Sequence, residues 1–305
     1  MSENNSKPNR RQFLGTAGLV GAGAVLASCA PATAATPGKA NLDVAIANFA
    51  LNLEYLEAAF YLAAVGRIGE LPGGSAQVIL PSGFDGRTAI NFKDAGVASY
   101  AQEIAQDELN HVLFLRKVLT TAAVDRPVLD IGPAFAAAAN AAAYNAKLIA
   151  PPATLSPAFN PYLNDLFFLH GAFIFEDVGV TAYKGAARLI SDDSAGGILE
   201  SAAGILAVEA YHAGEIRTQL YDQKDVMTPY GVTVAQLIGA ISDLRGAVGG
   251  GKDQGIVVDG KANIVVTDSN SIAFSRSTAE VLPIVYLGGV GKGGFFPNGL
   301  NGAIK

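Results

Sequence analysis

The stretch Glu108-Leu109-Asn110-His111 and its counterpart Glu209-Ala210-Tyr211-His212 are two copies of the pattern Glu-x-x-His, one in each half of the chain. Around each copy the apolar residues recur at steps of three and four, which indicates an amphipathic helix. The spacing of three places the carboxylate and the imidazole one turn apart on the same helix face. Both side chains can therefore reach a single metal ion.

These two motifs stand out because histidine is rare in the chain. The sequence has three histidines and 11 glutamates in 305 residues. A histidine thus has a roughly one-in-28 chance of a glutamate three positions before it, and the chance that at least two of three do is on the order of a few in a thousand. The third histidine, His170, has no such partner, and we interpret it as a structural residue.

Four long segments carry helical periodicity, and together they predict an all-α fold, a four-helix bundle over residues 41–224. Two long connections separate them, as in bundles with a crossover, and the second connection contains an alanine-rich stretch that predicts a short extra helix at Ala134–Ala150. The four long helices are expected at Leu42–Val65, Ala95–Ala122, Tyr162–Ile190 and Gly197–Tyr221.

The first and third of these helices share a different pattern, a glutamate followed seven residues later by a tyrosine. Glu54 precedes Tyr61, and Glu176 precedes Tyr183, so each pair lies on one helix face two turns apart. The two halves of the bundle therefore look like diverged copies of one helical hairpin. Glu57 is the alternative to Glu54, since it lies one turn from Tyr61.

A dinuclear metal site is the simplest explanation for these residues. A glutamate on an apolar helix face is costly unless it is paired or bound to a metal. Four carboxylates that converge in a bundle core would repel one another, whereas two divalent cations would neutralise their charges. Oxygen and nitrogen ligands with open positions suit two iron or manganese ions.

The order Glu, Glu-x-x-His, Glu, Glu-x-x-His resembles that of the ferritin-like di-iron carboxylate proteins. Three segments, 176–183, Ala273-Phe274-Ser275-Arg276 and Phe295-Phe296-Pro297-Asn298-Gly299, are more closely similar to the ferritin-like desiccation-related proteins of plants and bacteria. This resemblance covers residues 41–301 and implies a ferritin-like fold. It also implies six metal ligands: Glu54, Glu108, His111, Glu176, Glu209 and His212.

Three further residues lie beside the expected ligands. Tyr61 and Tyr183 are candidates for a redox-active group or a hydrogen bond to a ligand, and a purely structural place in the core is the alternative. Asp107 is a candidate for orienting an imidazole, and a solvated place on the helix surface is the alternative.

Residues 225–305 predict a C-terminal extension packed on the bundle. Thr233 is suited to cap a helix, and Ser277 with Glu280 forms a capping-box pattern for a short last helix. Between them, Ile256–Gly260 and Ile264–Val266 predict a small hairpin. The glycine-rich segment Gly288–Asn301 is expected to form a packed loop.

The first 28 residues predict a twin-arginine-type signal peptide, because Arg10-Arg11-Gln12-Phe13-Leu14 precedes a short apolar run. Leu26-Ala27-Ser28-Cys29 resembles a lipobox, so lipidation of Cys29 would attach the linker 29–40 to a membrane. The alternative is an ordinary signal that is cleaved after Ala34. In both cases we expect an exported protein of the periplasm or cell envelope.

Composition excludes several other functions. The net charge of −6 argues against nucleic-acid binding, and a single cysteine cannot build a disulfide framework or an iron–sulfur cluster. The sequence therefore predicts redox chemistry with dioxygen or peroxide at the metal pair, in stress protection. The alternative is a non-enzymatic protein that protects the envelope during desiccation. Storage in a closed cage is disfavoured, since the anchor and the extension would obstruct a shell.

Overall fold

Four long helices form the centre of the structure, a computed structural model that describes residues 41–305. Their bounds agree with the predicted ranges to within three residues, and the predicted all-α bundle is confirmed. The predicted signal peptide and linker, with Cys29, lie outside the described residues. The four helices are α2 (Asp43–Ala64), α3 (Ala95–Leu119), α5 (Asp165–Ala187) and α6 (Ile198–Asp222).

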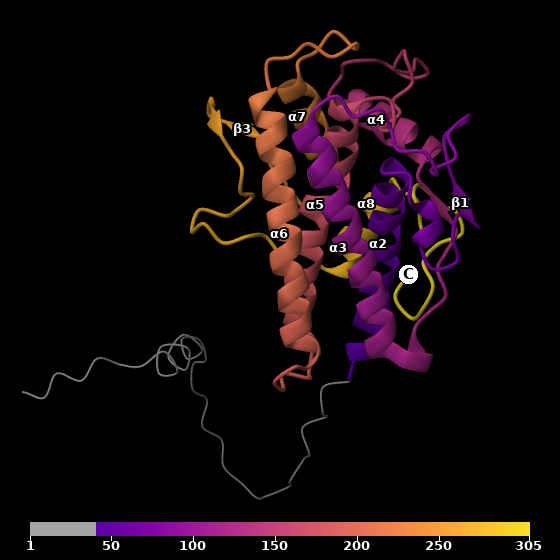
Figure 1. Cartoon of the computed structure of the whole chain (residues 1–305). Coiled ribbons are helices and arrows are strands. Elements are labelled where there is room, and N and C mark those ends of the chain that lie inside the picture. Colours follow the sequence, from indigo (N-terminus) through magenta and orange to yellow (C-terminus); the bar gives the residue numbers. More distant parts are fainter. Residues whose placement is uncertain (1–40) are drawn as a thin grey trace, which may run out of the picture. The chain divides into compact units, whose positions relative to one another are not determined.

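These helices pair as two hairpins. α2 packs along α3 and α5 packs along α6, and α2 also touches α5 in the middle of the bundle (Figure 1). α2 and α5 are buried on nearly all sides, whereas α3 and α6 are buried along one face. By length and composition α5 could cross a membrane, but here it is enclosed by the rest of the bundle.

Polar side chains fix where two of the helices begin. The Asp94 carboxylate accepts hydrogen bonds from the backbone N–H groups of Gly96 and Val97 at the start of α3. The Asn164 side chain accepts one from the N–H of Phe167 at the start of α5. Each cap satisfies donors that the first turn of a helix leaves free.

The two long connections contain short elements. The first holds the 3-10 turn η1 (Ile68–Glu70) and β1 (Val78–Ile79), and α3 is followed by a second such turn, η2 (Thr120–Ala122). The second connection holds β2 (Leu129–Asp130), which pairs in parallel with β1, and α4 (Pro133–Asn145). The prediction that this helix reaches Ala150 is wrong, because Lys147 takes a positive φ of 58° that a right-handed helix cannot contain.

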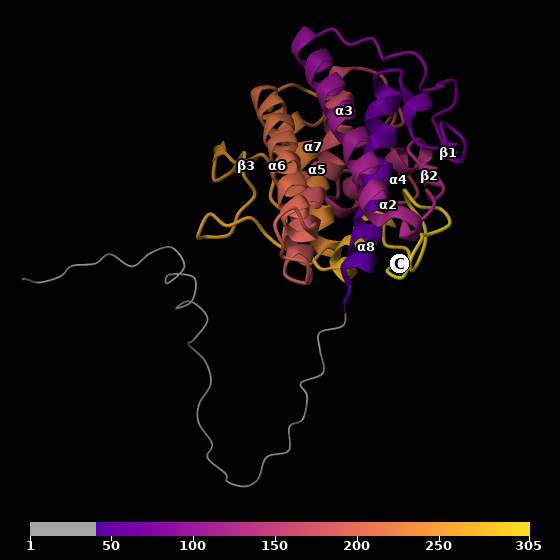
Figure 2. The same ribbon diagram turned by 60° about the horizontal axis from the view of Figure 1, so that its bottom comes forward.

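The extension comprises α7 (Val234–Val248), β3 (Val257–Val258), β4 (Lys261–Ala262) and α8 (Thr278–Val285). The capping boxes at Thr233 and Ser277 are both present. The predicted hairpin exists, beside α6 (Figures 1 and 2), but its second strand is not Ile264–Val266. Asp259 and Gly260 both take positive φ, so a two-residue turn brings the chain straight back into pairing at Lys261.

A buried network of charges ties the extension to the bundle. Asp177 on α5 accepts hydrogen bonds from Arg217 on α6 and Arg245 on α7. Asp253 accepts from Arg245 and from Arg276, which precedes α8. All three arginines are at most 3% exposed, so nearly every guanidinium N–H needs a protein partner.

Candidate metal centre

The structure brings all six predicted ligand residues into one buried cluster in the middle of the bundle. One glutamate comes from each of α2 and α5, and one Glu-x-x-His pair comes from each of α3 and α6. Each residue is at most 8% exposed. The members are Glu54, Glu108, His111, Glu176, Glu209 and His212.

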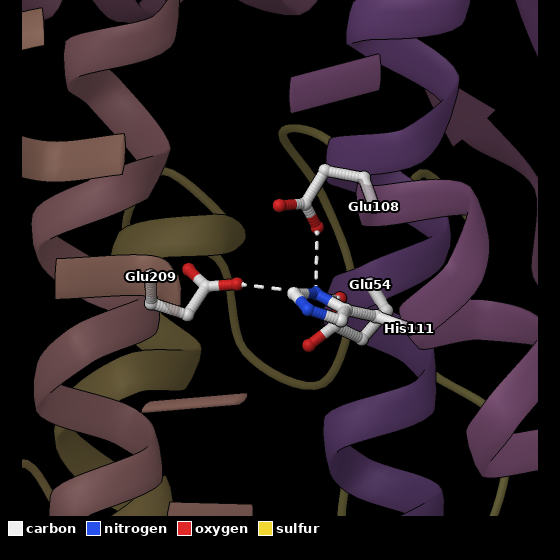
Figure 3. Close-up of side chains that lie close together, drawn as sticks. All are labelled: Glu54, Glu108, His111 and Glu209. Atoms are coloured by element: carbon white, nitrogen blue, oxygen red, sulfur yellow. Dashed lines mark hydrogen bonds and ion pairs between the residues drawn. The ribbon is translucent and has the colours of Figure 1, made fainter. Parts of the chain in front are cut away.

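One part of the cluster surrounds His111. Its Nδ1 lies 3.1 Å from Glu54 Oε2, 3.5 Å from Glu108 Oε2 and 3.6 Å from Glu209 Oε1. Figure 3 shows these four side chains directed toward one another from three helices. One ligand atom from each lies within 4.8 Å of the others, which is close enough for all four to hold one metal ion.

The other part surrounds His212 and shares Glu108 with the first. His212 Nδ1 lies 3.1 Å from Glu108 Oε1 and 3.6 Å from Glu176 Oε2. The two oxygens of Glu108 thus face the two histidines, one each. A carboxylate in this position can join two neighbouring cations.

Several atoms in the cluster are buried without a hydrogen-bond partner among the described residues. They are both carboxylate oxygens of Glu108, both of Glu209, Glu176 Oε2 and His212 Nδ1. Leaving such an atom unsatisfied costs about 1–3 kcal/mol, and more where the group is charged. Carboxylate oxygens and imidazole nitrogens are ligand atoms that bind iron and manganese. The cluster is therefore compatible with a di-metal site, and the role of the six residues as ligands stays a prediction.

Burial and mutual repulsion favour the protonated form of most of these carboxylates. Burial raises the pKa of Glu54 to about 7, and it also raises the pKa of Glu176. The pKa of Glu209 is well above its usual range, because burial and the nearby Glu108 both oppose its charge. Metal binding would have to displace these protons.

The pKa shifts of Glu108 and of the two histidines favour the charged forms instead. Burial alone would raise the pKa of Glu108, but the nearby His111 and His212 lower it well below its usual range. Burial would lower the histidine pKa values, yet Glu54 and Glu108 raise that of His111 to about 11. Glu176 and Glu108 raise the pKa of His212 to about 12 in the same way. Without metal, these shifts favour the ionised form of Glu108 and the protonated forms of His111 and His212.

The two tyrosines cross between the halves of the bundle. The Tyr61 hydroxyl from the first half donates to Glu176 Oε1 in the second, and the Tyr183 hydroxyl donates to Glu54 Oε1 in the first. Burial, followed by the nearby carboxylates, raises both tyrosine pKa values well above their usual range, so both keep their protons. Each tyrosine thus makes a hydrogen bond to a predicted ligand from the other half of the bundle.

Asp107 and His170 lie in different settings. Asp107 Oδ2 lies 3.3 Å from His212 Nε2, the ring nitrogen that points away from the cluster. His170 is fully buried outside the cluster, and its Nδ1 lies 2.7 Å from the carbonyl oxygen of Leu166. Burial lowers the pKa of His170 to about 4, so the ring is neutral, as expected of a structural histidine.

Glu57 is a further buried carboxylate at the edge of the cluster. The structure places Glu54, and not Glu57, beside His111. Glu57 approaches Gly179 on α5, where an added Cβ would lie 3.5 Å from Glu57 Oε1 and 2.2 Å from Glu209 Oε2. Burial and the charges of its neighbours raise the pKa of Glu57 well above its usual range. The sequence indicates Glu57 only as an alternative to Glu54, because spacing along one helix cannot show that both side chains are buried.

Comparisons with known proteins agree with a ferritin-like helical bundle. A family model described as a ferritin-like domain matches residues 42–222. The desiccation-related protein PCC13-62 of Craterostigma plantagineum is 33% identical over 79% of this chain and 76% of its own length. The ferritin-like catalase Nec2 of Nesocodon mauritianus is 31% identical over 91% of this chain and 89% of its own length. No solved structure gives a significant match.

Proposed function

Because the chain belongs to the ferritin-like domain family, we propose that its cluster binds two iron or manganese ions and carries out redox chemistry with peroxide. The observation that carries this proposal is the set of buried, unpartnered oxygen and nitrogen atoms around Glu108. The relative named as a ferritin-like catalase favours peroxide over dioxygen as the substrate.

When bound, a pair of such ions would supply the electron transfers that convert two hydrogen peroxide molecules into two water molecules and one dioxygen molecule. The chain's own residues would position that pair. Glu108 would offer one oxygen on the side of each histidine, and His111 and His212 would offer one nitrogen each. The hydroxyls of Tyr183 and Tyr61 would hold one oxygen each of Glu54 and Glu176 and leave the other oxygen free for metal.

Metal content and oxygen release test the proposal together. The purified protein is depleted of metal, reconstituted anaerobically with Mn²⁺ or Fe²⁺, and given hydrogen peroxide at an oxygen electrode. We expect about two metal ions per chain, the number that a dinuclear site holds, and release of oxygen. The double variant Glu108→Ala with Glu209→Ala should lose both.

Glu103→Ala is the matched control, because Glu103 is an exposed glutamate on the same helix as Glu108. It should retain metal and oxygen release. Less than about one metal ion per chain in the unmodified protein would contradict the metal site. Full metal content without oxygen release would contradict the peroxide reaction alone.

A second candidate function is non-enzymatic protection during drying, and the relative named as a desiccation-related protein favours it. In this case the metal site would be structural or vestigial. The test is to dry a labile reporter enzyme together with the protein and measure the reporter activity that survives. Equal protection by the unmodified protein and by the Glu108→Ala, Glu209→Ala double variant would support this function over the redox one.

The N-terminal sequence supports a proposal for where the protein acts. We propose export through the paired arginines Arg10 and Arg11, and attachment to a membrane through lipidated Cys29. Cys29→Ser should move the exported protein from the membrane fraction to the soluble fraction. Arg10→Lys with Arg11→Lys should keep the protein in the cytoplasm. An unchanged membrane association of Cys29→Ser would contradict the anchor.

A further inference from the structure

The predicted ligands of the two halves of the metal centre correspond, but a residue next to them in the sequence differs. Glu54 and Tyr61 correspond to Glu176 and Tyr183, and the motif that starts at Glu108 corresponds to the one that starts at Glu209. The residue before Glu108 is Asp107, whereas the residue before Glu209 is Val208. The Asp107 carboxylate therefore has no counterpart in the other half.

This difference changes the surroundings of the two imidazoles. His212 turns Nδ1 toward Glu108 and Glu176 and has Asp107 Oδ2 3.3 Å from its Nε2. His111 also turns Nδ1 toward the cluster, but its Nε2 has no hydrogen-bond partner within residues 41–305. Val208, at the position that corresponds to Asp107, has no polar side-chain atom to offer.

A carboxylate behind a metal-bound imidazole has a defined effect. Binding a metal through Nδ1 requires the ring proton to be on Nε2, and an acceptor at Nε2 fixes that tautomer and the orientation of the ring. Removing such a partner typically weakens metal binding by about 10- to 100-fold. In this chain only one of the two imidazoles has that support within the described residues.

We propose that Asp107 is a positioning residue that acts through His212 and makes the two metal positions inequivalent. This inference rests on the proposed di-metal function. The position beside His212 has a ring that is oriented before metal arrives. The position beside His111 relies on its surrounding carboxylates, Glu54, Glu108 and Glu209, to hold the ion. The two ions therefore bind in two distinguishable steps.

Titration of the metal-free protein with Mn²⁺, followed by calorimetry, tests the inference. The unmodified protein should show two binding steps. Asp107→Val, which gives α3 the residue that α6 carries at the corresponding position, should weaken one step by about 10- to 100-fold and leave the other within about twofold. Asp107→Asn should have a smaller effect, because its amide oxygen can still accept from Nε2. Val208→Ala is the control and should change neither step.

Proton NMR of the Co²⁺-loaded protein gives a readout that a general loss of structure would not mimic. Each bound imidazole should contribute one strongly shifted, exchangeable N–H signal. In the unmodified protein one signal should exchange slowly with water, because His212 donates to Asp107, and the other should exchange quickly. In Asp107→Val both should exchange quickly.

The outcomes separate this inference from the proposal on which it rests. Two metal ions that bind the unmodified protein and Asp107→Val identically would overturn the role of Asp107 and leave the di-metal site intact. Equal exchange rates of the two N–H signals in the unmodified protein would do the same. Failure of the unmodified protein to bind any metal would overturn both proposals. The thermal transition of metal-free Asp107→Val should match the unmodified protein, since Asp107 is 36% exposed at its side chain.

Discussion

Gly179 shows how one missing side chain shapes the metal centre. It lies on α5, four residues before Tyr183. This position corresponds to that of Glu57 on α2, which lies four residues before Tyr61. The Glu209 carboxylate occupies the space where a side chain at 179 would begin. The cluster therefore depends on a glycine that carries no chemistry of its own.

We expect Gly179→Ala to displace the Glu209 carboxylate, because the new Cβ would lie 2.2 Å from Glu209 Oε2. Metal content measured after reconstitution should fall below that of the unmodified protein. Gly204→Ala on α6 is the matched control, since nothing lies within 4 Å of its added Cβ. That variant should keep its metal and gain up to about 1 kcal/mol in unfolding free energy from helix propensity. Equal metal content in both variants would contradict the prediction.

The shifted carboxylates predict how stability depends on pH in the metal-free protein. Burial raises the pKa of Glu54 from 4.5 to about 7, so its contribution is fully present below pH 4.5 and is lost as pH rises through 7. The raised pKa values of Glu57, Glu209 and the two histidines act in the same direction. The thermal transition of the metal-free protein should therefore fall between pH 5 and pH 8.

Bound metal should remove this dependence, because the ions replace the protons that the carboxylates otherwise retain. The check is a series of thermal melts at fixed ionic strength, with a chelator in one set and Mn²⁺ in the other. A metal-free transition temperature that rises from pH 5 to pH 8 would contradict the interpretation of the cluster as a set of buried, protonated carboxylates.

At the scale of elements, the helices and the predicted ligands followed from local rules, while the contacts between distant segments did not. Apolar residues recur along one face of α3 and of α6, which is the face that is buried. Thr233 and Ser277 are residue types that cap the first turn of a helix. β1 and β2 are two residues long, too short for alternation to show, so no sequence pattern predicts their pairing. The sequence pattern also could not predict that Glu57 is buried, since this depends on which face of α2 meets α5.

The same distinction holds inside the candidate site. Spacing alone placed Glu108 with His111 and Glu209 with His212, because residues three apart share a helix face whatever the rest of the chain does. The crossed bonds of Tyr61 and Tyr183 could not be predicted in this way. They depend on how two hairpins dock, which no pattern within one helix specifies.

The contact between α5 and the extension predicts a large loss of stability for Asp177→Ala. The carboxylate accepts hydrogen bonds from Arg217 and Arg245, and both would remain buried with part of their charge unpaired. Breaking a buried pair by removing one partner costs about 3–5 kcal/mol. Urea unfolding should show a decrease of that size for Asp177→Ala. Asp243→Ala, at an exposed position on α7, is the control and should unfold like the unmodified protein.

At the scale of the whole molecule, the extension is part of the fold that holds the site. Phe295 packs edge-on against Phe175 of α5, with ring centres 4.9 Å apart, and against Phe135 of α4 at 5.2 Å. Arg276 donates from its side chain to Thr181 on α5, within one turn of helix from Tyr183. The extension thus packs against both α4 and α5.

A chain that ends at residue 224 should therefore fail to behave as a folded bundle. It would expose Phe175 and leave Asp177 without Arg245. Exposed apolar surface of this kind promotes aggregation. Size-exclusion chromatography should find the shortened protein in aggregates, and reconstitution should give little bound metal. A soluble, metal-binding monomer would show that the extension is dispensable for the site.

The crossed tyrosines have a consequence for how the molecule is assembled. Each hairpin contributes the hydroxyl that orients a glutamate of the other, so neither hairpin contains a finished half of the centre. If the chain were divided in the connection between α4 and α5, each fragment would be chemically incomplete. Only the reassociated fragments would then bind metal, so the uptake of two ions would report that the two fragments had associated.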